Sequence, residues 1–154
     1  MYKKSKFNEN KGLTLIELMI VIGIISTLAG IVVPSLGNYI QRARMIKTTE
    51  KLKMIETAIL SYEMDMLTFP SNLAQIGLGT LKDPWGNPYQ YLPVQGAKKG
   101  KLRKDHFMVP VNTDFDLYSM GPDGKSVSPF TAKASRDDIV RANNGQYFGS
   151  VSGY

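Results

Sequence analysis

The sequence predicts an α+β protein in which a long N-terminal α-helix packs on a small antiparallel β-sheet head. Three observations lead to this fold class. Residues 13–33 form an apolar run whose one charged residue is Glu17. Apolar residues then recur at steps of three and four as far as Met66, which is the spacing of one helix face. After Leu81 the chain changes to turn residues and short segments that are typical of strands.

The first twelve residues form a polar, basic segment ahead of the apolar run. They hold four lysines and one glutamate, so they carry half of the formal net charge of +6. A run of about 20 apolar residues can span a bilayer core, and a basic flank tends to stay in the cytoplasm. We therefore expect residues 1–12 to be a leader, residues 13–36 a membrane-spanning helix, and residues 37–154 a head on the far side of the membrane.

The apolar run has other interpretations. A cleaved secretory signal needs a small-x-small site after its apolar core, and this sequence offers a poor one. A plain membrane anchor or a buried core helix would leave Glu17 without a role, although a carboxylate in an apolar span is costly and usually has a partner. Cleavage between Gly12 and Leu13 would supply that partner. The new α-amine would lie one helical turn from Glu17, or would pair with Glu17 of a neighbouring subunit.

The second half of the long helix is expected to be amphipathic. Its apolar stripe would pack against the head, while most charged residues fall off the stripe. Phe69 and Pro70 should end the helix, because the residue before a proline avoids helical geometry. The stripe consists of Leu52, Ile55, Ile59, Tyr62 and Met66.

Three segments of the head are strand candidates: Tyr89 to Leu92, His106 to Val111, and Phe115 to Met120. Pro110 favours an edge position for the second segment. The third alternates apolar and polar residues most clearly.

The composition argues against an enzyme. The chain has no cysteine, so disulfides and thiol nucleophiles are excluded. Its one histidine, His106, has no nucleophile or second metal ligand nearby in the sequence. The basic run of residues 98–104 lacks interleaved aromatic residues, so a nucleic-acid partner is not expected. Trp85 and the tyrosines around it are expected to pack the head rather than bind a ligand.

The segment KGLTLIELMIVIGIIS resembles the prepilin-type N-terminus of the type IV pilin-like superfamily. The resemblance implies that a membrane prepilin peptidase cuts after Gly12 and that the new N-terminus at Leu13 is methylated. It also implies that Glu17 serves filament assembly. Leu13 departs from the phenylalanine that the family most often has there, and Pro34 matches a proline that the family often carries in this helix.

The segments LKDPWGNPYQY and FDLYSMGPDG are similar to the major pseudopilin of type II secretion systems. That resemblance implies a homopolymeric filament in the periplasm that drives protein export. Its expected partners are an inner-membrane assembly platform and minor pseudopilins. Two alternatives stay open: a type IV pilus major pilin for adhesion, motility or DNA uptake, and a membrane-anchored periplasmic binding module or enzyme.

The same resemblance implies a calcium ion in the last loop. Calcium takes six to eight oxygen ligands from carboxylates and backbone carbonyls. By resemblance, the ligands would be the carboxylates of Asp123, Asp137 and Asp138 and carbonyls near Met120 and Val127. The loop is longer than expected for the family, and residues 139–154 extend beyond its usual end. From the residues alone, a solvated acidic turn without a metal is the competing interpretation.

Overall fold

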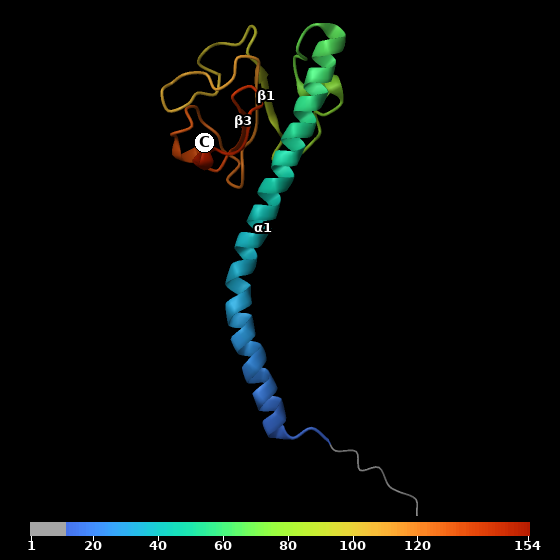
Figure 1. The fold of residues 1–154 in the computed structure, drawn as a ribbon, viewed down its shortest axis with the longest axis vertical. Coiled ribbons are helices and arrows are strands. Elements are labelled where there is room, and N and C mark those ends of the chain that lie inside the picture. Colours follow the sequence, from blue (N-terminus) through green and yellow to red (C-terminus); the bar gives the residue numbers. More distant parts are fainter. Residues whose placement is uncertain (1–11) are drawn as a thin grey trace, which may run out of the picture. The chain divides into compact units, whose positions relative to one another are not determined.

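The computed structural model describes residues 12–154, without the side chains of residues 32–35. Residues 1–11, most of the expected leader, lie outside the described residues. The chain divides between Ile40 and Gln41 into two compact units. Helix α1 (Leu15–Met66, 52 residues) begins in the first unit and ends in the second, which we call the head (Figure 1). The long N-terminal helix predicted from the sequence is confirmed.

Within the head, α1 buries one face. Leu52, Ile55 and Ile59 have no exposed surface, and they belong to one cluster with Phe115 and Leu117. Full burial of a large aliphatic side chain stabilises a fold by about 1.5–3 kcal/mol. These three positions of the predicted stripe therefore fix how the head is assembled on its helix.

The last turn of α1 differs from the prediction. Tyr62 is half-buried, but Met66 is 60% exposed and does not join the packed face. The helix ends at Met66 because Leu67 takes a left-handed φ of 58°, with its N–H bonded to the Glu63 carbonyl at 2.8 Å. The helix therefore ends at Met66, where the predicted apolar stripe ends and just ahead of the Phe69-Pro70 stop signal.

Four strands form one antiparallel sheet in the order β1-β2-β3-β4. Tyr91 pairs with Leu117, and Tyr118 pairs with Val140. Each strand pairs with its neighbour along the chain, so the sheet is a simple meander. The strands are β1 (Gln90–Pro93), β2 (Phe115–Ser119), β3 (Ile139–Ala142) and β4 (Tyr147–Ser150).

The strand predictions at β1 and β2 are confirmed, but the strand predicted for His106 to Val111 is wrong. That segment forms a turn closed by a single bridge between Lys104 and Pro110. The Asp105 carboxylate accepts hydrogen bonds from the N–H groups of Phe107 (2.8 Å) and Val109 (2.9 Å), which holds the chain in the turn. The sheet is completed instead by β3 and β4, which were not among the predicted strands.

The two faces of the sheet carry different clusters, as strand alternation requires. Ile139 packs in the cluster with α1, whereas Val140 and Ala142 pack in a second cluster with Phe130. Phe130 belongs to the long connection between β2 and β3. One face is thus covered by the helix and the other by the chain that follows β2.

Candidate functional site

Asp83 joins the Asp-Pro-Trp-Gly-Asn-Pro turn to the end of β2. Its Oδ1 accepts hydrogen bonds from the backbone N–H groups of Trp85 (3.0 Å) and Asn87 (2.8 Å), and its Oδ2 accepts one from the Ser119 hydroxyl (2.6 Å). The Asn87 side chain donates in turn to the Gly121 carbonyl at 2.9 Å. Asp83 is buried. The two head segments that resemble one family are therefore held together by one carboxylate.

The C-terminal loop, residues 121–138, follows directly. Gly121 has a φ of 63°, and a Cβ there would clash with the Asp137 carbonyl, so the position requires glycine. The Asp123 N–H donates to Asp137 Oδ2 at 3.2 Å, and Asp123 Oδ1 accepts from the Lys125 N–H at 2.7 Å. The structure thus places the backbone of Asp123 against the carboxylate of Asp137, two of the residues predicted as ligands.

The third carboxylate, Asp138, is fully buried and paired with Arg103. Asp138 Oδ2 lies 2.8 Å from Arg103 Nη2 and also accepts a hydrogen bond from the Ser126 hydroxyl. Asp138 Oδ1 is buried and makes no hydrogen bond within residues 12–154. Burial raises the pKa of Asp138 to about 7, against the lowering effects of Ser126 and Arg103. This carboxylate is therefore part of an internal ion pair.

These contacts bear on the predicted calcium site. Across residues 12–154, no group of three or more histidine, aspartate or glutamate side chains is arranged to hold a metal ion. Asp138 already pairs with a cation, and the Val127 carbonyl accepts a hydrogen bond from the Ser135 hydroxyl. Met120 lies half-buried just after β2. Calcium binding therefore stays a prediction.

Arg103 is a buried charged residue whose place in the fold the sequence did not indicate. It stands in a basic run that indicated a solvated turn, yet only 5% of its surface is exposed. Its guanidinium carbon lies 4.6 Å from the ring centroid of Tyr118 and 5.3 Å from that of Phe130. Aromatic residues on two elements far along the chain create this site, so the local sequence held no signal for it.

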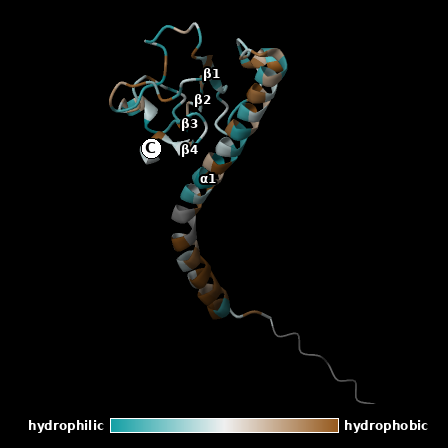
Figure 2. Cartoon of the chain, turned by 45° about the horizontal axis from the view of Figure 1, so that its top comes forward, coloured by the Kyte–Doolittle hydropathy of each residue, from teal (hydrophilic) through white to brown (hydrophobic). Residues whose placement is uncertain are grey.

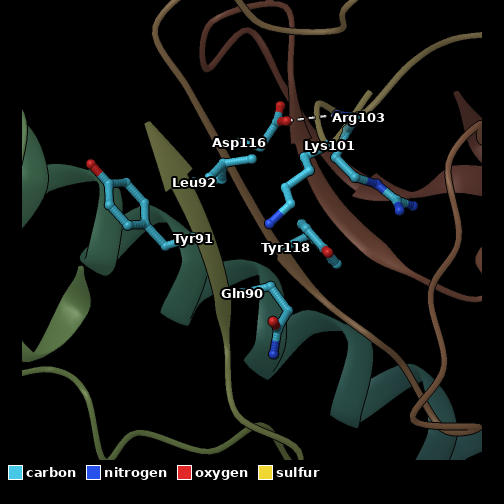
Figure 3. Close-up of a pocket in the computed structure, with 7 residues that line it drawn as sticks. All are labelled: Gln90, Tyr91, Leu92, Lys101, Arg103, Asp116 and Tyr118. Carbon is cyan, nitrogen blue, oxygen red and sulfur yellow. Dashed lines mark hydrogen bonds between the residues drawn. The ribbon is translucent and has the colours of Figure 1, made fainter. Parts of the chain in front are cut away.

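Figure 3 shows a pocket beside β1 and β2 that includes Arg103 and Asp116. The Asp116 carboxylate accepts hydrogen bonds from the Arg103 backbone N–H (2.7 Å) and the Asn112 side-chain amide (3.1 Å). Burial is the main cause that raises the pKa of Asp116. Tyr91 points to the other side of β1 in this view. Arg103 and Asp116 are thus engaged in holding the fold, and the residues that line the pocket offer no paired nucleophile and base.

At the other end of the chain, Thr14 and Glu17 form a capping box. Glu17 Oε2 accepts hydrogen bonds from the backbone N–H (2.8 Å) and the hydroxyl (2.7 Å) of Thr14, and the Glu17 N–H donates to the Thr14 hydroxyl at 3.3 Å. The Thr-x-x-Glu spacing of the sequence is itself the signal for this cap, and it gives Glu17 a partner besides the predicted α-amine. Glu17 therefore has a partner in the uncut chain.

Gly12 precedes this cap and is exposed. A Cβ added there would meet no other atom within 4 Å, so the fold of the described chain does not itself require glycine at this position.

The first part of α1 exposes its apolar residues on every side. Exposed fractions run from 79% at Leu15 to 50% at Val21 and 70% at Ile31, and Figure 2 shows the same concentration of apolar residues. In the part of the chain that the structure describes, no single straight helix passes as a membrane span by length and composition. The pair Leu15–Ile31 and Leu36–Met66 passes when it is taken as one bent unit. So large an exposed apolar surface requires lipid or other helices around it.

An apolar N-terminal helix capped by Thr14 and Glu17, followed by a helix-backed antiparallel head, defines a type IV pilin-like protein. The prokaryotic N-terminal methylation motif matches residues 8–33. This match agrees with an apolar helix that is anchored in the inner membrane before assembly.

The type II secretion system core protein G of Pseudomonas aeruginosa is 34% identical over 140 residues, which cover 76% of this chain and 87% of that protein. The Vibrio cholerae core protein G is 28% identical, covering 78% of this chain and 86% of its own length. A fimbrial protein of Neisseria meningitidis is 27% identical over 86% of this chain and 83% of its own length. No solved structure gives a significant match. The chain belongs to the core protein G family, the major pseudopilins, whose members are structural subunits and not enzymes.

Proposed function

We propose that this chain is the main subunit of a type II secretion pseudopilus, a periplasmic filament whose growth and shortening push exported proteins through an outer-membrane channel. The observation that carries the proposal is the first part of α1, which is apolar and exposed on every side except for the one carboxylate of Glu17 at its start. Such a surface is compatible with lipid before assembly and with a bundle of identical helices afterwards.

The leader accounts for the first steps. Its lysines keep the N-terminus in the cytoplasm, where a prepilin peptidase would cut between Gly12 and Leu13 and methylate Leu13. The head then lies in the periplasm. An inner-membrane assembly platform would lift each subunit into the filament, and minor pseudopilins would be its further partners.

Deletion of the gene in its host tests this function. The expected result is that exported proteins accumulate in the periplasm while surface pili, if the host has any, are unchanged. Complementation with the unaltered chain should restore release. Normal release of exported proteins after deletion would contradict the proposal.

A type IV pilus major pilin is the second candidate, and the similarity to the Neisseria meningitidis fimbrial protein favours it. The same deletion separates the two functions. Loss of long surface filaments with undisturbed protein release would identify a pilin, whereas the core protein G relatives favour the opposite outcome.

A further inference from the structure

We propose that the buried guanidinium of Arg103 holds the C-terminal loop closed in this chain, in the place where the family resemblance implies a calcium ion. The loop needs such a tie. It runs over residues 121–138, and its only regular element is the short 3-10 helix Lys133–Ser135. The chain contains no cysteine that could cross-link it, and ordering each free residue costs about 1–2 kcal/mol of backbone entropy.

Arg103 reaches both parts of the loop that need holding. Its Nη2 donates to Ser135 Oγ at 3.1 Å and to Asp138 Oδ2 at 2.8 Å, so one nitrogen binds two residues near the end of the loop. The carboxylate of Asp138 accepts a hydrogen bond from the Ser126 hydroxyl, and Ser135 Oγ accepts one from the Val127 N–H at 2.8 Å. The same two anchors therefore fasten the middle of the loop as well.

Two aromatic rings lie against the guanidinium of Arg103. Tyr118 of β2 and Phe130 of the loop lie within cation–π distance of the guanidinium, and Phe130 is 2% exposed. The backbone also ties this segment to the loop, because the Phe130 N–H donates to the Lys104 carbonyl at 3.0 Å. Arg103 is thus a built-in cation at the centre of the loop's contacts.

This arrangement competes with a metal ion for the same ligands. A divalent cation bound at Asp138 would lie close to the positive charge of Arg103, and like charges repel strongly in a buried site. The Val127 carbonyl already accepts a hydrogen bond from the Ser135 hydroxyl. The Asp137 carboxylate already accepts one from the Asp123 backbone N–H. A chain that supplies its own buried cation gains no further tie from calcium there.

Two measurements on the full-length protein in detergent test the proposal. Trp85 is the only tryptophan and belongs to the head, so its fluorescence reports unfolding of the head. Lys125, Lys133 and Arg136 all lie in the loop, so trypsin cleavage after them reports loop opening. Both are measured in millimolar calcium and in chelator, for the natural chain, Arg103→Met, and Arg42→Met as a matched exposed control.

We expect the melting temperature and loop cleavage of the natural chain to be the same with calcium and with chelator. In Arg103→Met, trypsin should cut the loop at least tenfold faster, and the melting temperature should be several degrees lower. Arg42→Met should change neither. If Arg103→Met cannot be purified, Ser135→Ala, which removes one anchor without leaving a buried charge, should still speed loop cleavage. A calcium-dependent rise in melting temperature of the natural chain overturns the proposal. The proposal is also overturned if trypsin cuts the loop of Arg103→Met no faster than that of the natural chain. Where Ser135→Ala has to replace Arg103→Met, unchanged cleavage of Ser135→Ala has the same meaning.

Discussion

Arg141 of β3 and Glu56 of α1 form an ion pair with an Nε–Oε1 distance of 2.6 Å, across 85 positions of sequence. The Arg141 guanidinium also binds both carboxylate oxygens of Asp114, at 2.6 and 2.8 Å, and lies 4.0 Å from the ring centroid of Phe115. Its side chain is 1% exposed. One arginine thus connects the helix, the start of β2 and β3 on the face of the sheet that α1 covers.

Replacement of Arg141 by methionine should destabilise the head strongly. Methionine fills similar volume but leaves Glu56 and Asp114 without their cation, and loss of one partner of a buried pair costs about 3 kcal/mol or more. The measurement is the free energy of unfolding from Trp85 fluorescence in denaturant. Arg42→Met serves as the exposed control.

Glu56→Gln and Asp114→Asn, alone and combined with Arg141→Met, complete the test as double-mutant cycles. Coupling energies near zero for both pairs would contradict the prediction and would leave the packing on Phe115 and the hydrogen bonds to Asn112 and the Phe115 carbonyl as the contribution of the arginine.

Tyr91 should make the head sensitive to alkaline pH. Its hydroxyl donates a hydrogen bond to the Pro70 carbonyl at 2.9 Å, and burial, followed by the negative charge of Asp114, raises the pKa of Tyr91 well above its usual value of 10.0. The unfolded chain loses this proton at a lower pH than the folded chain. Stability is therefore fully present below about pH 10 and is lost as pH rises from there toward the folded pKa.

Tyr91→Phe separates this effect from other titrations. At pH 8 the variant should be less stable by about 1 kcal/mol, because one hydrogen bond is lost. Between pH 8 and pH 11 its melting temperature should fall less than that of the natural chain. Tyr39→Phe, at an exposed position outside the head, is the control. Parallel pH profiles for the natural chain and Tyr91→Phe would contradict the assignment.

The parts of the fold that the sequence predicted are those with a local periodic signal. The extent of α1 and the strands β1 and β2 follow from apolar spacing within each segment. The turn that begins at Asp83 could be predicted from its residues. The hydrogen bond from the Ser119 hydroxyl to the Asp83 carboxylate could not, because the two residues are 36 positions apart. β3 and β4 lie beyond the segments that resembled a family, and β3 carries the charged Arg141 in a buried position. An arginine in a four-residue segment does not indicate a buried strand.

Arg103 shows the same limit for the candidate site. Four lysines surround it in the run of residues 98–104, and its neighbours Lys101 and Lys104 are not buried. What distinguishes Arg103 is the set of groups that meet it, Tyr118, Phe130 and Asp138, which come from β2 and from the second half of the C-terminal loop. Only the tertiary fold places them together. The capping box at Thr14 is the opposite case, since its spacing alone predicts it.

Gly12→Val should block processing of the leader. The branched side chain would crowd the bond to be cut, whereas a Cβ at this position meets no other atom of the described chain, so the variant should remain folded. Intact mass of membrane-extracted protein checks the prediction. The natural chain should have lost residues 1–12 and gained a methyl group on Leu13, and the variant should retain the leader. A natural chain that keeps Met1 in a host with the peptidase would contradict it.

Replacement of Glu17 should stop filament assembly and leave membrane insertion intact. Removing a charge from an apolar span makes insertion easier. Two variants distinguish the two partners of this carboxylate. Glu17→Gln keeps an oxygen that can accept from Thr14 and so preserves the capping box, but it has no charge to pair with the α-amine of a neighbouring Leu13. Glu17→Val loses both interactions.

If the neighbour's amine is the partner that matters, both variants should appear in the membrane fraction at normal levels, and both should yield few or irregular filaments when sheared or imaged. Thr14→Val is the matched control. It removes the Thr14 hydroxyl from the cap but leaves the charge of Glu17 in place, so its filaments should be closer to normal than those of either Glu17 variant. Regular, abundant filaments with Glu17→Gln would instead assign the carboxylate to the cap, and equally abundant filaments with Glu17→Val would remove it from assembly altogether.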